Sequence, residues 1–403
     1  MMKMKNLLIL SAALLLLAAT LLPATAEAVP AFARTHGLSC STCHAPFPRL
    51  KPFGDEFAGN GFTIPEEEKA RDFISAGDDL LKLNKVFPVA VRFDAYATFE
   101  SDTDVTSDLK SPWGLKLLSG GNLAKNVGYY FYFYMDERGE VAGVEDAYIH
   151  FNNIGGSTFD IMVGQFQTSD PLMKRELRLT YEDYNIYKTS IGQSMTNLTY
   201  DRGVMMTYGF ESTGTGLVGF VVNGNGKPDA DAQRHYDSDK YKNFGGKITQ
   251  DVGDFLGLGF YYYYGKEVGF ENLGGGNFDL ANPHKNEVTY WGPDFTLGNG
   301  MFDLTCQYLV RNDTDPLFTG GDVDVETTGI IAELVISPQR DRSTRYLTLL
   351  YNQIDSDWGA YNDETFTISG THLLARNLRG VVEYTRNLEQ ETDRGVVGLV
   401  SGF

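Results

Sequence analysis

From about residue 86 to the C-terminus, apolar and polar residues alternate in short runs that are separated by Gly, Asn and Asp. Alternation with a period of two is typical of a β-strand whose two faces meet different surroundings. The pattern therefore predicts an all-β region of about sixteen strands. These strands are expected to begin near Val89, Trp113, Gly128, Val144, Phe159, Arg202, Leu217, Lys242, Leu256, Glu287, Phe302, Val325, Thr344, Thr365, Arg379 and Arg394.

The spacing of these strands indicates a transmembrane barrel. Each strand with its connection takes roughly 20 residues, which suits strands of about 10 residues that cross a membrane at a tilt. Connections after every second strand are short, as at 298–300 and 376–378, whereas several of the others are long and acidic. We expect an antiparallel β-barrel in a bacterial outer membrane, with its short turns in the periplasm. A water-soluble β-sandwich or propeller is the alternative, although aromatic clusters at 129–134 and 261–264 favour a membrane interface.

The N-terminal part of the chain differs from the barrel region. Residues 1–28 have the features of a secretory signal peptide, because Lys3 and Lys5 precede an apolar run that ends near Leu22. Residues 29–85 hold two of the three cysteines, several prolines and two helix-compatible stretches, Pro52–Gly59 and Pro65–Phe73. They predict a small helical module, which can plug the lumen of a barrel formed by residues 86–403.

The sequence Cys40-Ser-Thr-Cys43-His44 has the spacing at which c-type haem is attached. Two thiols reach the vinyl groups of the porphyrin, and the adjacent imidazole ligates the iron. We therefore expect one covalent haem c, with Cys40 and Cys43 as attachment sites and His44 as the proximal iron ligand. A redox disulfide of the thioredoxin type is the main alternative, but no βαβ pattern surrounds the motif. A zinc site would need further Cys or His ligands, and only His36 lies nearby.

The second axial ligand of the haem iron is left open by the sequence. His36 lies shortly before the motif and is one candidate. His150 is another, because its parity on the predicted strand 144–151 places it on the polar face, towards the lumen. Met205 is a further inward candidate, whereas Met135 and His372 share the apolar face and are expected to point to lipid. An iron without a second protein ligand is also compatible with the sequence.

Other side chains are expected to surround the haem or to face lipid. Arg49 and Lys51 can pair with the haem propionates. Cys306 alternates with apolar residues and is expected to be a small side chain that faces the membrane. The phenylalanines expected at the haem edge are Phe47, Phe53, Phe57 and Phe62.

The chain is acidic, with a formal net charge of −19 at pH 7. This charge disfavours nucleic acid as a partner, because binding to phosphates requires Lys and Arg. Carboxylate oxygens can instead gather ferrous or other divalent cations, although similar loops often serve solubility alone. The acidic segments expected at the outer face are 100–108, 229–239, 313–324 and 355–364.

Several short runs together resemble the N-terminus of the fused monohaem cytochrome-porins of outer membranes, a family that includes bacterial Fe(II) oxidases. These runs are Pro30-Ala-Phe-Ala-Arg34, Gly37, the motif 40–44, Pro48-Arg-Leu50 and Pro52-Phe-Gly54. The barrel half is similar only in kind, and Gly164-Gln-Phe166 with Asp201-Arg-Gly-Val204 looks equally like phosphate-selective porins.

The resemblance implies an all-β fold: a transmembrane antiparallel barrel of about 16 strands, preceded by a small α-helical c-type cytochrome module. It also implies electron transfer between an extracellular metal and periplasmic cytochromes or other electron carriers. Iron is the metal that we expect first. The direction of transfer is not fixed by the resemblance, and no acid–base pair or nucleophile is expected. The alternative function is a diffusion porin for ions or small solutes, in which the haem module is a gate or redox sensor.

Overall fold

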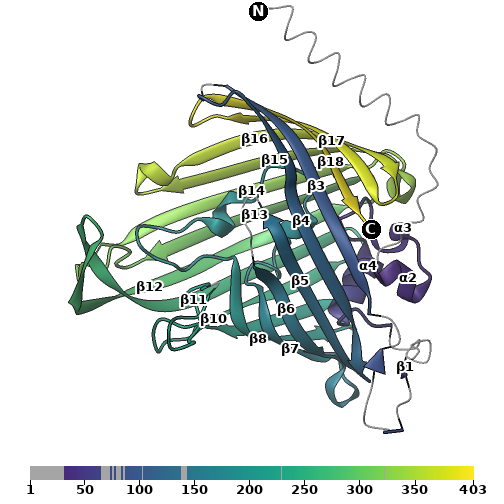
Figure 1. Ribbon diagram of the computed structural model, residues 1–403, viewed down its shortest axis with the longest axis horizontal. Coiled ribbons are helices and arrows are strands. Elements are labelled where there is room, and N and C mark those ends of the chain that lie inside the picture. Colours follow the sequence, from purple (N-terminus) through teal and green to yellow (C-terminus); the bar gives the residue numbers. More distant parts are fainter. Residues whose placement is uncertain are drawn as a thin grey trace, which may run out of the picture.

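Sixteen antiparallel strands close into one barrel, in which the first strand, β3, pairs with the last, β18 (Figure 1). The computed structural model describes residues 31–64, 73–74, 77–78, 83–84, 87–101, 103–137, 143–227, 229–321 and 323–403. The predicted barrel and its strand number are confirmed, and the alternative of a soluble sandwich or propeller is wrong. The predicted signal peptide 1–28 lies outside the described residues.

Each barrel strand pairs with its neighbours in sequence, so the barrel is a simple up-and-down meander. The first eight strands are β3 (Val89–Glu100), β4 (Ser107–Ala124), β5 (Val127–Glu137), β6 (Val144–Phe151), β7 (Phe159–Gln167), β8 (Tyr200–Phe210), β9 (Thr215–Val222) and β10 (Asn243–Val252). The second eight are β11 (Leu256–Gly274), β12 (Asn277–Gly298), β13 (Phe302–Asp313), β14 (Val325–Ile336), β15 (Arg345–Ser356), β16 (Asp363–Ala375), β17 (Leu378–Asn387) and β18 (Thr392–Gly402).

Two predicted starts differ clearly from the observed ones. The strand expected from Trp113 begins at Ser107, and the strand expected from Glu287 begins at Asn277. The added segments are mostly polar and lie at strand ends that project away from the middle of the barrel (Figure 1). A segment outside the apolar band has no need of an apolar face, so alternation of hydrophobicity cannot reveal it.

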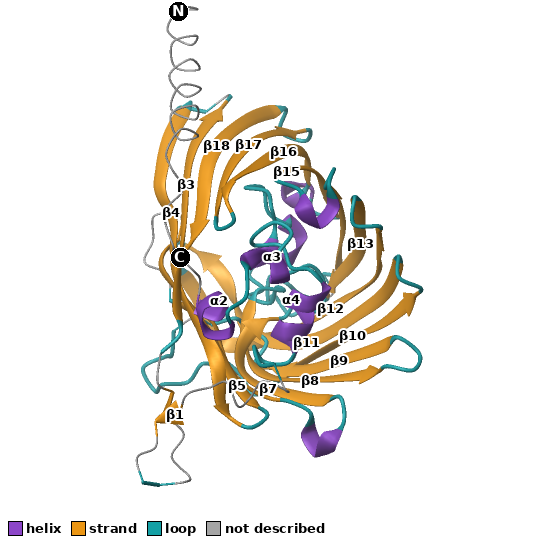
Figure 2. Ribbon diagram, turned by 90° about the vertical axis from the view of Figure 1, so that its right-hand side faces the viewer, coloured by secondary structure: helices purple, strands orange, loops and turns teal. Residues whose placement is uncertain are grey.

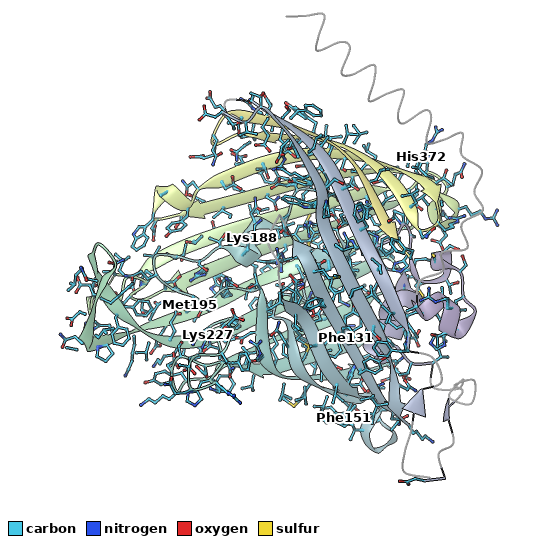
Figure 3. The ribbon with its side chains drawn as sticks, viewed as in Figure 1. Phe131, Phe151, Lys188, Met195, Lys227 and His372 are labelled. Atoms are coloured by element: carbon cyan, nitrogen blue, oxygen red, sulfur yellow. The ribbon has the colours of Figure 1, made fainter. Side chains whose placement is uncertain are left out.

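The strands present an apolar face outwards and a more polar face to the lumen. In β16, Phe366 and Ile368 are exposed on the outer face, whereas the intervening Thr367 is buried inside the barrel. The exposed ring of Phe151 and the exposed imidazole of His372, both labelled in Figure 3, also belong to the outer face. A closed barrel with such a belt leaves no unpaired strand edge in lipid, as a membrane-spanning sheet requires. No helix in the described part of the chain is long and apolar enough to cross a membrane.

The two ends of the barrel differ in their connections. Turns after β4, β12 and β16 are tight, whereas the connections after β7 and β9 run through residues 168–199 and 223–242. Short turns face the periplasm in outer-membrane barrels, so we call their end the periplasmic end. The four acidic segments predicted at the outer face lie on connections at the other end, or on strand ends next to them.

A helical module, residues 31–64, occupies the periplasmic mouth of the barrel (Figure 2). It contains α2 (Ala31–His36), α3 (Cys40–Cys43) and α4 (Pro52–Gly59), of which α4 matches its predicted bounds. Of the second predicted helix, residues 65–72 lie outside the described residues. Its last residue, Phe73, instead belongs to the short strand β1 (Phe73–Ile74), which pairs with β2 (Leu83–Asn84).

The main apolar core lies inside the barrel. The connection 168–199, which we call the inward loop, enters the lumen with the short turns η3 (Arg175–Leu177) and η4 (Asn185–Lys188). Its Ile186 and Tyr187 are fully buried in one cluster with inward side chains of the strands, such as Tyr263 and Leu350. The described lumen is therefore packed by the chain itself in this region.

Candidate functional site

The two motif cysteines lie on one helical turn of the module. Ser39 caps α3 by accepting a hydrogen bond from the backbone N–H of Ser41, at 3.3 Å. Because residues three apart share a face of a helix, Cys40 and Cys43 are presented together. Both thiols are free and half-buried, and burial raises the pKa of each. A thioredoxin-like redox pair instead depends on a lowered thiol pKa.

The imidazole of His44 is held in one tautomer. Its Nδ1 lies 2.9 Å from the carbonyl oxygen of Pro48. A carbonyl can only accept a hydrogen bond, so Nδ1 carries the proton and Nε2 keeps its lone pair. Burial lowers the pKa of His44, which favours this neutral form. A ring nitrogen of this kind is prepared to bind a metal, because a backbone carbonyl on the other nitrogen is the usual support of a ligating histidine.

The chain after His44 turns back and packs closely on the motif. His44 forms an antiparallel bridge with Leu50, and the N–H of Lys51 donates to the carbonyl of Cys43 at 2.8 Å. Gly54 of α4 then approaches so closely that a Cβ there would lie 2.4 Å from the carbonyl oxygen of Cys43. Only glycine fits this position without a backbone shift, so the Pro52-Phe-Gly54 run serves the packing of α4 on α3.

Aromatic rings fill one side of the module. Phe32 stacks on Phe62 with a centroid distance of 4.8 Å, and Phe62 stacks on Tyr130 of the barrel wall at 4.5 Å. Phe57 meets the edge of Phe32 at 5.4 Å. Of the four phenylalanines predicted around the haem, Phe47, Phe57 and Phe62 line the adjacent cavity. The expectation for Phe53 is wrong, because its side chain is 39% exposed and does not line that cavity.

Polar contacts dock the module onto the periplasmic turns. Arg49 forms an ion pair with Asp303 at 3.0 Å, and Lys51 forms one with Asp341 at 2.6 Å. Both basic groups thus have an acidic partner on the barrel and neither lines the cavity, and the pairing of Arg49 and Lys51 with haem propionates stays a prediction. At the opposite side of the mouth, the amide of Asn152 donates to the carbonyl oxygen of Asn60 at 2.5 Å.

A cavity of about 410 Å³ lies between the module, the barrel wall and the inward loop. Its size lies in the range of sites for small molecules and cofactors, and its surface is mostly apolar with a few polar groups. Cys40, Cys43 and His44 line it from the module, together with His36. His150 lines it from the barrel wall, so the structure brings the predicted attachment residues, the predicted proximal ligand and the two candidate histidines to one cavity.

The wall of the cavity carries a row of three side chains on neighbouring strands. His150 of β6 pairs with Met162 of β7, and Met162 pairs with Met205 of β8, so all three share the inward face. His150 is 3% exposed, and its Nδ1 has no hydrogen-bond partner. Leaving such a buried polar atom unsatisfied costs roughly 1–3 kcal/mol. The predicted inward orientation of His150 and Met205 is confirmed, as is the outward orientation of Met135, Cys306 and His372.

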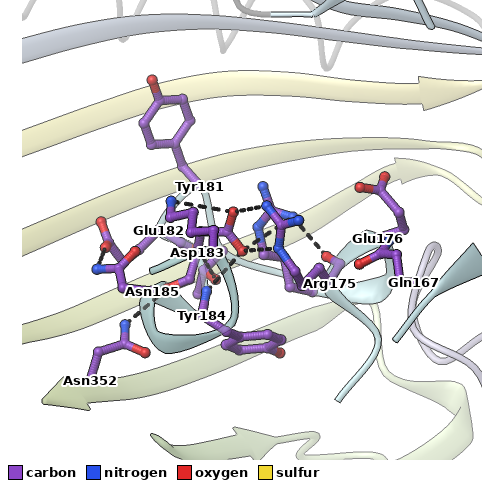
Figure 4. Close-up of polar contacts among 12 residues, drawn as sticks. Gln167, Arg175, Glu176, Tyr181, Glu182, Asp183, Tyr184, Asn185 and Asn352 are labelled. Carbon is purple, nitrogen blue, oxygen red and sulfur yellow. Dashed lines mark hydrogen bonds and ion pairs between the residues drawn. The ribbon is translucent and has the colours of Figure 1, made fainter. Parts of the chain in front are cut away.

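The inward loop lines the cavity on the side away from the module, and buried charged groups hold its shape and tie it to the barrel (Figure 4). Within the loop, Asp183 forms a bidentate ion pair with Arg175, with contacts of 2.6 and 3.2 Å. Glu383 of β17 accepts the backbone N–H groups of Tyr181 and Glu182 at 2.7 and 2.9 Å. Burial alone would raise the pKa of Asp183, but its arginine neighbours hold it well below the usual range. The ion pair of Asp183 with Arg175 inside the loop therefore stays charged at neutral pH.

Two carboxyl groups of the loop, those of Asp170 and Glu176, line the cavity, and their pKa values are shifted in opposite directions. Burial alone would raise the pKa of Glu176, but Lys116, at 3.0 Å, and Arg92 lower it below the usual range. Asp170 has no such close pair, and burial raises its pKa to about 6. Asp146 of the barrel wall adds a further carboxyl group, whose Oδ1 has no hydrogen-bond partner.

The residues present fit a covalently bound haem. Two free thiols on one turn, a neighbouring imidazole with a free Nε2 lone pair, aromatic walls and an unpartnered imidazole across the cavity are the groups that such a cofactor uses. Zinc fits less well, since the described residues contain no group of three or more His, Cys, Asp or Glu side chains arranged to hold a metal ion.

Sequence reasoning missed Phe32, Tyr130 and the whole inward loop. Phe32 lies within the Pro30–Arg34 run and could have been noticed as a fifth phenylalanine near the motif. The inward loop has no comparable sequence signal, because its polar residues are also typical of connections that are exposed to solvent.

The closed barrel, the apolar outer belt and the short periplasmic turns define a porin-type barrel of the bacterial outer membrane. Solved structures with this architecture include a loop-deletion variant of OmpT from Vibrio cholerae and an anion-selective porin from Comamonas acidovorans. Each is 12% identical to this chain and covers 79% of it and 99% of its own length, with a TM-score of 0.54.

OmpF of Salmonella typhi, in a complex with daunomycin, is similar at 12% identity and a TM-score of 0.54, over 78% of this chain and 97% of its own. At such identities the likeness concerns the fold alone. No family model matches the sequence, and no curated protein matches it either.

Proposed function

We propose that this protein transfers electrons across the outer membrane through a single c-type haem held in the cavity at the periplasmic mouth of the barrel. The observation that carries this proposal is the convergence of Cys40, Cys43 and His44 on one cavity of about 410 Å³, inside a barrel that is otherwise packed. The bound haem would supply one-electron transfer. The resemblance of the N-terminal runs to cytochrome-porins supports the same assignment.

The chain's own residues would position the cofactor and exclude water from it. Cys40 and Cys43 would hold it covalently, His44 would offer Nε2 to the iron, and Phe32 and Phe62 would cover it with apolar surface. The carbonyl of Pro48 keeps the proton of His44 on Nδ1. An apolar site that excludes water favours a defined reduction potential of the haem, because hydrogen bonding and solvent exposure strongly influence that potential.

Placement inside the lumen supports transfer between the two sides of the membrane. The apolar band of an outer membrane is about 25 Å tall, so a cofactor in the lumen shortens the path from either side. The periplasmic mouth would face periplasmic cytochromes or other carriers. The acidic connections at the opposite end would gather an extracellular cation such as Fe²⁺, because carboxylates are hard oxygen ligands.

The test is anaerobic stopped-flow spectroscopy of the full-length protein, purified from cells that attach haem c. Mixing the ferric protein with Fe²⁺, and the reduced protein with Fe³⁺ chelates, reports both directions of transfer. We expect a covalent haem spectrum and rapid change with at least one of the two iron species. The proposal fails if the purified protein carries no covalent haem, or if neither iron species changes its spectrum.

A second function, diffusion of ions or small solutes, is favoured by the fold comparisons, which include a porin named as anion-selective. The packing of the lumen disfavours free diffusion of solutes, because the inward loop and the module both occupy it. Single-channel conductance in planar bilayers separates the two functions. A large, steady conductance in a protein that shows no redox reaction with iron would favour the porin.

A further inference from the structure

The proposed haem site assigns one side of the iron to His44 and leaves the other side without an assigned residue. The protein side chains that commonly bind haem iron include His, Met, Cys and Tyr. Among the residues that line the cavity, the His and Met side chains besides His44 are His36, His150, Met162 and Met205. They divide into one histidine on the module and a row of three side chains on the barrel wall.

His150 stands out because it is a buried polar group without a partner. Its side chain is 3% exposed, its Nδ1 makes no hydrogen bond, and the residue lines the cavity. The nearest ring, Tyr148, lies edge-on at 6.4 Å and offers no hydrogen bond to that nitrogen. Buried polar groups in native proteins normally have a hydrogen-bond partner. The missing partner of His150 is explained if its imidazole binds a ligand in the cavity.

The backbone around His150 is rigid and is matched to the module. His150 pairs with Gly128 on β5 and with Met162 on β7, so the position of its Cα is fixed by two neighbouring strands. Gly61 of the module, at φ +63°, approaches so closely that a Cβ there would lie 3.1 Å from the Nδ1 of His150. Gly128 is also required to be small, because a Cβ there would lie 2.3 Å from the carbonyl oxygen of Gly61.

These two glycines let the module seat itself directly beside His150. The hydrogen bond from Asn152 to the carbonyl of Asn60 holds the same contact. The position of the module relative to the His150 imidazole is therefore set by contacts with Gly128 on β5, His150 on β6 and Asn152 just after β6.

The other candidates have a different setting. His36 lies on α2 at the edge of the module, is only half-buried, and packs edge-on against Phe57 at 5.3 Å. Met205 is buried in the lumen cluster together with Phe220, and Met162 packs against the same cluster. Both methionines thus have an apolar packing role that needs no metal.

We propose that His150 provides the second axial ligand of the haem iron. This inference rests on the proposed function. It makes the iron a link between the module, which contributes His44, and the barrel wall, which contributes His150. The haem would then fasten the plug to the barrel as well as carry electrons.

The test uses full-length protein made in cells with the haem-attachment machinery, and it compares His150→Ala, His150→Met, His36→Ala and Met205→Leu with the unaltered chain. Covalent haem is measured by haem staining after denaturing electrophoresis, and barrel folding by the mobility shift on heating. The ligation state of the ferric iron is read from electron paramagnetic resonance and visible spectra, so the readout does not depend on electron-transfer activity.

We expect the unaltered protein to be low-spin and His150→Ala to be high-spin with the same covalent haem content. Added imidazole should restore the low-spin signal in His150→Ala, which a purely structural role of the residue would not produce. His150→Met should show the charge-transfer band of a methionine bound to ferric iron. His36→Ala and Met205→Leu should both keep the low-spin spectrum of the unaltered chain.

The inference is overturned if His150→Ala remains low-spin, if the unaltered protein is high-spin, or if His36→Ala or Met205→Leu abolishes the low-spin signal instead. Should His150→Ala fail to fold, the methionine band in His150→Met decides the question, and its absence in a folded, haem-loaded protein counts against the inference. A complete lack of covalent haem in the unaltered chain is a different outcome, because it removes the proposed function itself.

Discussion

The inward loop and the N-terminal module both lie inside the barrel, but their polar groups differ in the partners that they contact. In the inward loop, Asp183 pairs with Arg175 of the same loop, and the backbone N–H groups of Tyr181 and Glu182 donate to Glu383 on the barrel wall. At the module, two free thiols and His150 line the cavity, and the buried Nδ1 of His150 has no hydrogen-bond partner. Satisfied groups indicate a structural plug, whereas unsatisfied groups beside a cavity indicate a ligand site.

This difference indicates separate roles for the inward loop and the N-terminal module. The inward loop packs inside the lumen and lines part of the cavity. The module would bring the cofactor-binding groups, and it is held by two ion pairs, by the Asn152–Asn60 hydrogen bond and by aromatic packing on Tyr130. Changes in the module should therefore alter cofactor content while the barrel stays intact, and changes in the loop anchors should alter stability while the cofactor stays attached.

The largest effect is expected from removal of the thiols. Cys40→Ser/Cys43→Ser should abolish covalent haem completely, because both attachment points are lost. Haem staining and intact mass report this directly. The matched control is Cys306→Ser on the outer face, which should keep the full haem content. The comparison breaks if the double variant retains covalent haem, or if it no longer folds as a barrel.

The next effect concerns the buried ion pair of Arg311 and Asp313, both of which have fully buried side chains. Arg311 also donates to the backbone carbonyls of Thr189 and Thr196, each at 2.8 Å, and so anchors the end of the inward loop. Arg311→Ala leaves an uncompensated buried carboxylate and should lower the free energy of unfolding by about 3–5 kcal/mol.

Urea unfolding in lipid vesicles measures this loss, and haem content per folded protein should stay unchanged. Arg386→Ala is the control, since that arginine forms a partly exposed pair with Asp393. An equal effect of the two substitutions would mean that the loop anchors carry no special stability.

A smaller effect is expected where the module docks. Arg49→Ala/Lys51→Ala removes two partly exposed ion pairs, each worth at most about 1 kcal/mol. The module should then be cut several-fold faster by protease from the periplasmic side, and salt should reduce the difference. Lys242→Ala/Arg386→Ala, which removes two pairs at the opposite end, should leave the cleavage rate unchanged. Equal cleavage of all three proteins would show that these contacts do not hold the module.

The smallest effect is a pH dependence of the midpoint potential. Asp170 faces the cavity near Asp146, Lys174 and Glu176, and burial raises its pKa to about 6. As pH rises through this value, Asp170 gains a negative charge that favours the ferric state, so the potential should fall. The slope should stay below about 59 mV per pH unit, the limit for one proton and one electron. In Asp170→Asn the slope near pH 6 should disappear, and a persistent slope would assign it to another group.

Much of the fold follows from local patterns in the sequence. Alternation placed most strand starts within a few residues of the observed positions, because each strand must keep an apolar face towards lipid. The same parity placed His150 and Met205 inside and Cys306 and His372 outside. It did not reveal the early start of β12 at Asn277, which lies beyond the apolar band.

The interior of the barrel could not be predicted in the same way. The inward loop is held by Glu383 and Arg379, partners about two hundred residues away in sequence. Arg49 likewise has its partner 254 residues away, so its role as a docking residue has no local signal. The motif 40–44 could be interpreted locally, since its chemistry depends on spacing within one helical turn.

We propose that electrons, but not solutes, cross this barrel by way of the module. The most direct measurement reconstitutes the protein in lipid vesicles that enclose an oxidised soluble cytochrome c, and adds a reductant coupled to a polymer too large for any porin. We expect the enclosed cytochrome to become reduced with the haem-loaded protein and to stay oxidised with Cys40→Ser/Cys43→Ser. Electron transfer through the module is ruled out if the enclosed cytochrome stays oxidised with the haem-loaded protein, or if both proteins reduce it at the same rate.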